Sequence, residues 1–373
     1  MKFQVERDVL AQAVAWTART LPNKPALPLL AGVLIIAEKN KLQLSSFDYE
    51  VSSKIEVQAN TTEDGRILVS GKLLAEIARS LPNQTVQANL NGSRLEIKCG
   101  KASFALPTLP EDDFPSLPEL PKLSGTINSE LFIEAVNQTA IAAGRDESLP
   151  MLTGVRMEIS ENKITFAATD RYRLAVKELF WNPKNTTEEK ALLIPARMLS
   201  EAAKGFIGTK EVSVGLAEGS EKLIGFYAET KQTTSRLLDA EFPKYRSLLP
   251  TEEQEGVEIS VSELLEVLKR VELVAERNTP VRLEFGKSEL TLRAGAGDEA
   301  TAEEIIAIEY SGEPIEIAFN PTYLKDGLTA LNKQTALISF TTSARPAILI
   351  GLDKDGVKDE SYKYLIMPVR LAG

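Results

Sequence analysis

Hydrophobic and polar positions follow two periods along this chain, and the two periods alternate. Apolar residues that recur every three or four positions predict helices, whereas strict alternation predicts strands. The first helical face comprises Val9, Leu10, Ala13, Val14 and Ala18. Alternating residues at 42–44 and 94–98 then predict strands.

A similar helical pattern recurs twice more. The second, less regular face comprises Leu131, Ile133, Ala135, Val136 and Thr139. The third comprises Leu264, Leu265, Val267, Leu268, Val271 and Val274, and Ser262 is expected to cap it. Three such helical openings in 373 residues indicate an internal repeat.

A direct sequence match supports the repeat. Segment 27–33 (LPLLAGV) resembles segment 149–155 (LPMLTGV), which lies 122 residues further on. In the same register Asp48 meets Asp170. A third, weaker copy is recognisable from 280–285 (PVRLEF). The chain is therefore expected to contain the same structural unit three times.

A second helix starts at the same internal point of each copy. Ser70, Pro195 and Asn320 stand where a helical pattern begins, and they are spaced 125 residues apart. Serine and asparagine are favoured helix caps, and proline is favoured in the first helical turn. Each copy is therefore expected to hold two helices and several antiparallel strands.

These elements predict an α+β fold with three domains of about 125 residues, in which two helices pack on antiparallel sheets. Proline-rich segments at 109–121 and 241–250 mark the boundaries. The expected domains are 1–122, 123–250 and 251–373. Triplication can serve stability alone, without functional meaning. Like domains joined by like contacts can also follow an arc and close into a ring by head-to-tail association.

Composition narrows the range of functions. The net charge is −10, so the overall field repels DNA and any attraction to a duplex must be local. The chain has no histidine and a single cysteine, Cys99. Catalysis by serine–histidine–aspartate or cysteine–histidine groups is therefore excluded, and neither a metal nor a cofactor is expected. A chain without a disulfide, a signal peptide or a long apolar run fits the cytoplasm.

Three other motifs give no support to an enzyme. Segment 65–73 has five residues between its glycines instead of the four of a phosphate loop, and leucine stands where a hydroxyl must bind magnesium. Segment 295–299 lacks the spaced oxygen ligands of a calcium site and predicts a hairpin turn. Asp48 and Asp170 occupy equivalent repeat positions, which favours a structural turn over acid–base chemistry. A hydrolase or transferase that uses carboxylates, and a repeat-built binding protein with no role on DNA, are the competing hypotheses.

Several segments match a known family. They are 1–3 (MKF), 168–175 (ATDRYRLA), 242–245 (FPKY), 310–312 (YSG), 319–323 (FNPTY) and 365–371 (LIMPVRL). With these motifs spread over its whole length, the chain resembles the β subunit of bacterial DNA polymerase III, the sliding clamp. The resemblance implies a head-to-tail homodimer whose domains form a ring around duplex DNA, with helices lining the hole. It also implies a processivity factor without a catalytic site.

By the same resemblance, polymerases and the clamp loader insert short linear peptides into one pocket between the second and third domains. The implied pocket residues are Leu152, Thr169, Arg171, Tyr172, Arg173, Leu174, Pro243, Leu248, Asn320, Tyr323, Ala344, Pro346, Met367, Pro368, Val369, Arg370 and Leu371. Their chemistry suits such a pocket, because apolar side chains form a slot and arginine and asparagine offer fixed polar contacts.

Part of this pocket departs from the family's pattern or has a plainer explanation. Arg171 and Tyr172 replace what is often a small residue followed by histidine, so peptide preference is expected to differ in detail. Ala344 and Pro346 stand where further pocket residues would fall. Alternatively, segment 365–367 is simply the last core strand, and one face of a strand can pack while the rest lines a groove.

Basic residues on the helices and adjoining loops are candidates for facing DNA. They are Arg7, Lys24, Lys72, Arg79, Arg145, Arg197, Lys204, Arg277 and Lys325, with Lys24, Arg79 and Arg197 preferred. The same helices carry Glu76, Glu134, Glu201 and Asp326. The basic residues form no simple stripe and are equally explained as ordinary solvated charges.

The resemblance also implies a dimer contact between the first domain and the third domain of the partner. In the first domain this contact is expected to use a single strand at 94–104. The candidate residues are Arg94, Lys98, Lys101, Phe104, Leu273, Val274, Glu299, Glu303 and Glu304. Opposite charges on mating strand edges would orient a head-to-tail contact, and pairing would cover edges that otherwise aggregate. Alternatively, both strands are merely charged and solvated.

Overall fold

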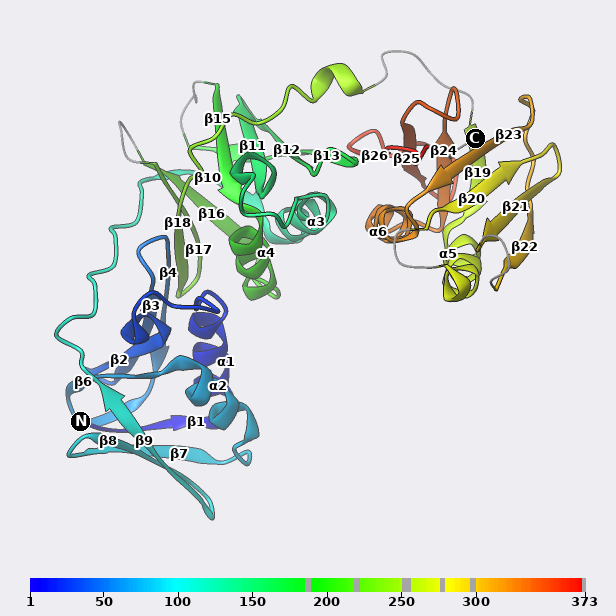
Figure 1. Cartoon of the computed structure of the whole chain (residues 1–373). Coiled ribbons are helices and arrows are strands. Elements are labelled where there is room, and N and C mark those ends of the chain that lie inside the picture. The colour runs from blue at the N-terminus through cyan, green and yellow to red at the C-terminus, as the bar shows by residue number, and fades with distance from the viewer. Residues whose placement is uncertain (185–188, 218–221, 250–255, 276–278, 296–299, 371–373) are drawn as a thin grey trace. The chain divides into compact units, whose positions relative to one another are not determined.

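The computed structural model describes residues 1–184, 189–217, 222–249, 256–275, 279–295 and 300–370 (Figure 1). By internal contacts the chain divides into two compact units. The first comprises Met1–Ile133, Trp181–Thr187 and Arg197–Leu237. The second comprises Glu134–Phe180, Glu188–Ala196 and Leu238–Gly373. The middle of the chain is split between the two units, because some of its strands belong to one sheet and the rest belong to another.

The first repeat is the set of elements from β1 to β9. Its helices are α1 (Arg7–Ala18) and α2 (Gly71–Ser80), with a short 3-10 turn η1 (Pro28–Ala31). Its strands are β1 (Lys2–Glu6), β2 (Gly32–Glu38), β3 (Lys41–Phe47), β4 (Val51–Gln58), β5 (Asn60–Glu63), β6 (Gly65–Ser70), β7 (Thr85–Asn91), β8 (Arg94–Cys99) and β9 (Ala102–Leu109). The two helices pack on each other, and α1 also contacts β3 and β4.

The second repeat runs from β10 to β18. Its helices are α3 (Ser129–Ala140) and α4 (Ala196–Gly205), with 3-10 turns η2 (Pro150–Leu152) and η3 (Arg246–Leu248). Its strands are β10 (Leu123–Asn128), β11 (Gly154–Ser160), β12 (Lys163–Thr169), β13 (Arg173–Phe180), β14 (Asn182–Pro183), β15 (Lys190–Pro195), β16 (Glu211–Leu216), β17 (Leu223–Ala228) and β18 (Lys231–Arg236).

The third repeat runs from β19 to β26. Its helices are α5 (Val261–Val271) and α6 (Pro321–Leu331), with the 3-10 turn η4 (Glu272–Val274). Its strands are β19 (Gly256–Ser260), β20 (Val281–Phe285), β21 (Glu289–Ala294), β22 (Ala302–Ala307), β23 (Ile315–Phe319), β24 (Thr335–Ser339), β25 (Ala347–Leu352) and β26 (Tyr362–Ile366). Helices α5 and α6 contact each other, as α1 and α2 do.

The same strand pairing recurs in all three repeats. The strand before the second helix pairs antiparallel with an earlier strand, as β2–β6, β11–β15 and β20–β23. The residues opposite each other are Val33 and Val69, Val155 and Ile194, and Val281 and Phe319. The triplication predicted from the sequence is therefore confirmed in backbone register, including the weak third copy.

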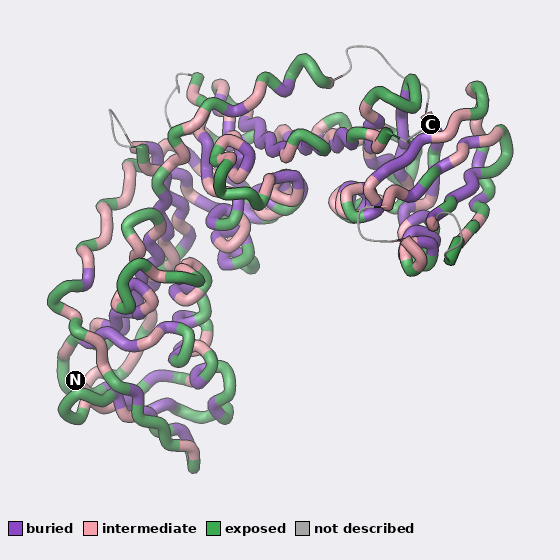
Figure 2. Tube along the Cα trace, viewed as in Figure 1, coloured by how far each residue is buried: buried purple, intermediate pink, exposed green. Residues whose placement is uncertain are grey.

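Strands of neighbouring repeats also pair. In the first compact unit, β18 pairs antiparallel with β4 and completes a sheet of 14 strands. In the second unit, β13 pairs antiparallel with β26 in a sheet of eight strands, beside a separate sheet of four. Figure 2 shows the buried segments running along the central strands of these sheets. We call these two strand pairs the first joint (β18–β4) and the second joint (β13–β26).

Two details of the helices differ from the sequence prediction. The side chain of Ser260, not that of Ser262, caps α5 by accepting a hydrogen bond from the Glu263 backbone N–H. In α3, Leu131 is 41% exposed, and Phe132 is buried in its place. The Asn320 cap is confirmed, since its side chain accepts from the N–H groups of the first turn of α6. Ser70 and Pro195 immediately precede α2 and α4, but the Ser70 side chain accepts no capping hydrogen bond from a described residue.

Segment 94–104 is also different from the expected single strand. It forms a hairpin of β8 and β9 that turns at Gly100, whose φ of 56° is positive. Strands β21 and β22, which flank segment 295–299, pair antiparallel as the predicted hairpin requires. Residues 296–299 of that turn lie outside the described residues.

Candidate functional site

A tight turn precedes β13 at the second joint. The Asp170 carboxylate accepts hydrogen bonds from the backbone N–H groups of Tyr172 and Arg173, both at 3.0 Å. The Thr169 hydroxyl donates to the Arg173 carbonyl at 2.6 Å, and Arg171 adopts a φ of 79°. This local bonding forces the side chains of Arg171 and Tyr172 outward, where both are exposed.

The first repeat has the same turn. The Asp48 carboxylate accepts from the N–H groups of Glu50 and Val51, at 3.0 and 2.7 Å. Tyr49, the counterpart of Arg171, has a φ of 74°. The structural turn role predicted for both aspartates is therefore confirmed.

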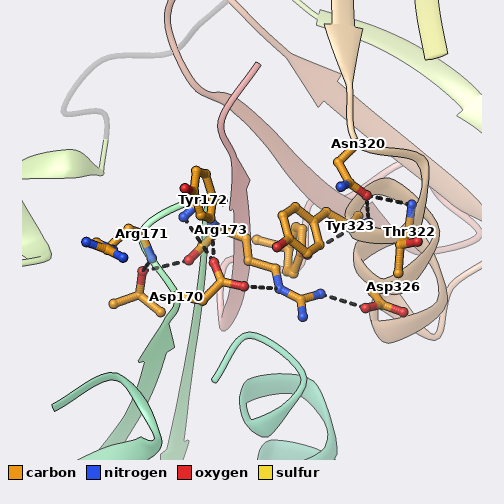
Figure 3. A network of polar contacts seen from close by, with 10 residues as sticks. Asp170, Arg171, Tyr172, Arg173, Asn320, Thr322, Tyr323 and Asp326 are labelled. Atoms are coloured by element: carbon orange, nitrogen blue, oxygen red, sulfur yellow. Dashed lines mark hydrogen bonds and ion pairs between the residues drawn. The ribbon is translucent and has the colours of Figure 1, made fainter. Parts of the chain in front are cut away.

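Arg173 lies at the centre of a polar network that Figure 3 shows. Its side chain is only 6% exposed. Its Nε donates to the Asp170 carboxylate at 3.0 Å, and its Nη1 donates to the Asp326 carboxylate at 2.6 Å. Its guanidinium carbon lies 4.4 Å from the centre of the Tyr323 ring, within the range of a cation–π interaction.

Helix α6 supplies the facing part of this network. The Asn320 side chain accepts from the N–H groups of Thr322 and Tyr323, at 3.0 and 3.3 Å, which fixes the start of the helix. The ring of Tyr323 stacks on that of Tyr172, with centres 6.3 Å apart and an interplanar angle of 25°. A turn of the second repeat and the first turn of a helix of the third repeat thus meet through a pair of aromatic rings.

The end of the chain runs along this pair. Strand β26 ends at Ile366, after which the Met367 N–H donates to the Tyr172 carbonyl at 2.8 Å. The Val369 N–H donates to the Ala318 carbonyl at 2.8 Å, while the Met367 side chain is 36% exposed. The core-strand alternative is therefore correct for 365–366, whereas 367–370 continue beyond the strand. Leu371 lies outside the described residues.

The segment before η3 borders the same sheet. Phe242 and Tyr245 are buried with Leu174 and Leu365, whereas Leu248 is 53% exposed. The Tyr245 hydroxyl donates to the Glu158 carboxylate at 3.0 Å. The segment is therefore anchored by its aromatic residues and presents Leu248 to solvent.

The negative charge of Glu158 is stabilised at the point where its carboxylate binds the segment that contains Tyr245. Burial acts to raise the pKa of this carboxyl, but hydrogen bonds from Arg156 and Arg246 outweigh it and leave the pKa below its usual value. Burial raises the pKa of Tyr245, with the Glu158 charge acting in the same direction. The carboxylate is therefore ionised and the phenol is protonated near neutral pH.

Several expected pocket residues do not line an open surface. Leu174, Leu152 and Arg173 are 1%, 5% and 6% exposed, because β13 and η2 pack into the core. Pro243 and Pro346 are half-buried, whereas Ala344 is exposed in the loop before β25. The exposed apolar and aromatic groups of the site are Tyr172, Leu248 and Met367, with Tyr323 partly exposed.

Comparison with known proteins decides the family. Residues 1–118, 126–244 and 246–370 match the N-terminal, central and C-terminal domains of the DNA polymerase III beta subunit. The chain belongs to this family. It is 50% identical to the beta sliding clamp of Streptomyces coelicolor, with both chains covered completely. It is 43% identical to the beta sliding clamp homolog GriR of Streptomyces muensis, over 99% of each chain.

Solved structures of the family are similar over the whole chain. The beta subunit of Thermotoga maritima matches with a TM-score of 0.89 at 26% identity, and each chain is covered completely. The sliding clamp of Pseudomonas aeruginosa bound to griselimycin matches with a TM-score of 0.88 at 26% identity, again with full coverage. The fold class and the family inferred from sequence motifs are therefore confirmed. As a sliding clamp, the chain is a DNA replication processivity factor rather than an enzyme.

Two further findings concern other classes of function. In the described part of the chain, no group of three or more potential ligands among histidine, cysteine, aspartate and glutamate could hold a metal ion. Within the same residues, no helix has the length and apolar character needed to cross a membrane.

The candidate DNA-facing residues fall into two groups. Those that are exposed and have no ion pair with a described residue are Lys24, Lys72, Arg79, Arg145 and Arg197. Three others, Arg7, Lys204 and Lys325, bind within their own chain. Lys204 pairs with Glu201, and Lys325 pairs with Glu272. Arg277 lies outside the described residues.

Arg7 has a structural role that the sequence did not reveal. Its guanidinium donates to the carbonyls of Leu81 and Arg79, at 3.0 and 2.8 Å, and to the Asp8 carboxylate at 2.7 Å. These bonds tie the start of α1 to the end of α2. Arg7 therefore has a structural role in the contact between the helices, and its expected position facing DNA stays a prediction.

The expected dimer residues include two whose charges are already paired. Glu303 binds Arg293 at 2.6 Å, and both carboxylate oxygens of Glu304 bind Arg270. Both carboxylates therefore already have an arginine partner within the chain, and their role in a dimer contact stays a prediction. Glu299 lies outside the described residues, and Arg94, Lys98 and Lys101 are exposed on the β8–β9 hairpin.

The apolar candidates for the dimer contact are exposed. Leu273 in η4 is 84% exposed, Phe104 on β9 is 37% exposed, and Val274 is half-buried. Ile305 on β22 is also 57% exposed, and sequence reasoning missed it. The signal was available, because Ile305 precedes a buried Ile306 in a strand where side chains alternate between faces.

Proposed function

We propose that two copies of this chain close head to tail into a ring that encircles duplex DNA in the cytoplasm. The ring would tether DNA polymerases and the clamp loader through short peptides. Its division into domains 1–122, 123–250 and 251–373 follows the three repeats. One observation supports this proposal. The two joints inside the chain are equivalent, and the chain also has the two open strand edges that would form a third such joint with a second copy.

The equivalence of the two joints is seen in their register. At the first joint Ile55 of β4 lies opposite Lys231 of β18, and at the second Lys177 of β13 lies opposite Tyr362 of β26. Ile55 and Lys177 are 122 residues apart, the same offset as in the sequence repeat. The repeats are thus joined twice by the same strand pairing.

The strands that would form a third joint are β22 and β9. Strand β22 is the third repeat's counterpart of β4 and β13, and it is the terminal strand of its sheet. Within the described residues, 102–107 of β9 pair only with β8. Because an open strand edge is a template for pairing with another chain, β9 of one copy is a fitting partner for β22 of the next.

The register of this third joint follows from the other two. The hairpin pair Cys99–Ala102 is equivalent to Ala228–Lys231. Carrying the register of both joints through the repeat places Ala102 opposite Glu304 of the partner. Phe104 then lies opposite Ala302 in an antiparallel ladder. Leu273, Ile305 and Phe104 are the apolar side chains available to be covered there.

Encirclement agrees with the net charge of −10. A protein that holds DNA by neutralising phosphates needs many cations, and its affinity falls steeply with salt. A closed ring is held by topology and needs only scattered cations. Lys24, Lys72, Arg79, Arg145 and Arg197 are the exposed candidates for these contacts.

A retention experiment tests encirclement. The chain is loaded by its clamp loader onto nicked circular DNA, and retention is measured by gel filtration before and after the circle is cut once. We expect retention on the circle and rapid loss after cutting, at a salt concentration that abolishes simple binding. Equal retention on circular and linear DNA would contradict a topological hold.

We further propose that partner peptides bind beside the Tyr172–Tyr323 pair, next to Leu248 and Met367. The support is chemical, because exposed apolar and aromatic groups converge there with an ordered polar frame. The related clamp of Pseudomonas aeruginosa binds griselimycin, and that compound is a suitable probe here. Pro243, Asn320, Pro368, Val369 and Arg370 complete the proposed site.

Substitution at the end of the chain tests this pocket. Met367→Ala together with Pro368→Ala is expected to abolish griselimycin binding in calorimetry, because it removes an exposed apolar side chain and relaxes the segment that follows β26. The dimer should persist in sedimentation, since neither residue lies on β9 or β22. Unchanged affinity in this double variant would disprove the pocket assignment.

A further inference from the structure

We infer that Arg173 is a positioning residue, which holds the two walls of the peptide pocket in register. One wall is the turn 169–173 of the second repeat, and the other is the first turn of α6 in the third repeat. The inference rests on the proposed peptide site. It goes beyond that site because Arg173, being buried, would act on a peptide only through its neighbours.

The contacts of Arg173 reach both walls at once. Its Nε binds the Asp170 carboxylate at 3.0 Å, and this carboxylate also accepts the N–H groups that set the turn. Its Nη1 binds Asp326 on α6 at 2.6 Å, and its plane lies over the Tyr323 ring at 4.4 Å. Figure 3 shows the guanidinium between the two walls. One rigid, planar group therefore fixes the turn and the helix relative to each other.

The stacked ring pair depends on the same geometry. Tyr172 is held by its own turn, and its carbonyl accepts the Met367 N–H at 2.8 Å. Tyr323 is held by Asn320, by Arg173 and through its carbonyl, which accepts the Tyr364 hydroxyl at 2.9 Å. The side chain that faces both Asp170 and Tyr323 is that of Arg173, so its loss would release one ring from the other.

The first repeat provides an internal comparison. Val51 stands at the position equivalent to Arg173, since both follow their turn aspartate by three residues. The Asp48 turn still forms, and Ser235 still pairs with Val51 in the first joint. Neither the turn nor the strand pairing therefore requires an arginine at this position. The first joint has a different guanidinium, that of Arg236 on β18, whose Nε donates to the Tyr49 carbonyl at 3.0 Å. Of these two joints, an arginine three residues after the turn aspartate occurs only at the one that carries the pocket, which points to a role in the pocket.

Lys177 offers a matched control on the same strand. It is 7% exposed, and it also crosses the second joint. Its Nζ lies 3.0 Å from the Ser361 hydroxyl, 3.4 Å from Glu134 and 3.9 Å from Asp359. None of these partners belongs to the turn 169–173 or to α6. Removing its charge weakens the joint and leaves both pocket walls with their own contacts.

The test compares griselimycin affinity of the full-length dimer with that of three variants by calorimetry. For Arg173→Met we expect the Kd to rise about tenfold or more, which corresponds to about 1.4 kcal/mol of lost binding free energy. Arg173→Lys should recover only part of the affinity, because an ammonium lacks the planar fork that reaches both carboxylates. Lys177→Met should bind as the wild type does, even though its melting temperature falls.

A double-mutant cycle separates positioning from general stability. If Arg173 acts through the tyrosine ring, Arg173→Met should cost much less affinity in a Tyr323→Ala background than in the wild type. A full, additive loss in that background would overturn the inference. So would equal losses from Arg173→Met and Lys177→Met, which would mean that the joint, and not the pocket walls, determines affinity.

The outcomes also distinguish this inference from the proposed pocket. If wild-type protein fails to bind griselimycin, the peptide site itself is disproved, and the inference falls with it. If wild type binds and Arg173→Met binds equally well, the site stands and only the role of Arg173 is disproved. Should Arg173→Met fail to fold in thermal denaturation, Arg173→Lys and Asp326→Asn carry the same comparison.

Discussion

At the scale of residues, an aromatic contact between the first and second repeats leaves no space for a larger side chain at the end of α4. The Trp16 ring of α1 packs on Phe206, with ring centres 5.2 Å apart, and its Nε1 donates to the Lys54 carbonyl at 3.0 Å. A methyl group added at Gly205 would lie 2.0 Å from the Trp16 ring. The last residue of α4 is therefore glycine because the indole occupies the place of a side chain.

This contact sets two effects against each other in Gly205→Ala. Helix propensity alone would stabilise the variant by about 1 kcal/mol. Overpacking against a fixed ring typically costs about 1–3 kcal/mol, and a 2.0 Å approach lies far inside van der Waals contact. We expect a net loss of stability in chemical denaturation. Gly286→Ala provides a milder comparison and should cost less, because its new methyl would lie 3.3 Å from the Glu289 carbonyl oxygen, a tight contact but far longer than 2.0 Å. A more stable Gly205→Ala variant would show that the indole moves freely.

A second prediction at this scale concerns pH. The folded-state pKa of Glu158 is lowered, so its contribution to stability is present above the unfolded-state pKa and is lost as the pH falls through the folded-state pKa. Glu158→Gln should therefore be less stable than wild type near pH 7, by about 1 kcal/mol after allowance for partial exposure. The difference should begin to narrow below about pH 4.3, the ordinary pKa of glutamate, and should close once the pH lies below the lowered folded-state pKa. Urea denaturation across this range measures the difference, and a constant gap would contradict the role of the charge.

Residue chemistry was predictable where it is local and was missed where it depends on distant neighbours. The turn role of Asp170 follows from a short-range pattern that recurs at Asp48, and it is confirmed. The contacts of Arg7 with Leu81 and Arg79, and the pairing of Glu304 with Arg270, join residues far apart in the chain. A single sequence holds no signal for such contacts, because the periodicity of hydrophobic residues does not indicate which distant polar or charged groups pair.

At the scale of elements, the same antiparallel strand pairing recurs in each repeat. Helix starts and strand periods were predictable because they depend on residues within one or two turns. The cap of α5 was misplaced by two residues, from Ser260 to Ser262, because both serines precede the apolar stripe. The β8–β9 hairpin was read as one strand, since the glycine that reverses it is a single residue, Gly100. The joints themselves were not predictable, as pairing between repeats leaves no period in the sequence.

The predicted third joint can be tested by cross-linking. In an antiparallel ladder, residues directly opposite each other have Cα atoms about 4.5–5.5 Å apart, within the range of a disulfide. Phe104→Cys combined with Ala302→Cys should therefore give a covalent dimer on mild oxidation, seen on a non-reducing gel. Cys99 is 1% exposed and does not compete.

The register is checked by a shifted pair. Ala307 lies five residues beyond Ala302 on β22, about 16 Å away along an extended strand. Phe104→Cys with Ala307→Cys should give no covalent dimer, and neither should any single variant. Efficient cross-linking of the shifted pair would mean that the third joint does not copy the register of the other two.

At the scale of the whole molecule, the proposed functions place different demands on the chain. The proposed peptide site lies within one copy, since its described residues all belong to the second compact unit. Encirclement requires two copies, because in the described part of one chain β22 and residues 102–107 of β9 each pair along one edge only. Peptide binding and retention on DNA should therefore be separable by mutation.

The decisive variant places charge on the apolar groups of the third joint. Leu273→Asp with Phe104→Asp should yield monomers in sedimentation, because burying two unpaired carboxylates at an interface costs several kcal/mol. These monomers should still bind griselimycin with an affinity near that of wild type, and they should show no retention on circular DNA. The matched control is Phe180→Asp, which charges a side chain that is 70% exposed and lies on neither β9 nor β22. If the monomers also lost peptide binding, the pocket would depend on the closed ring. Peptide binding and retention on DNA would then not be separable by mutation.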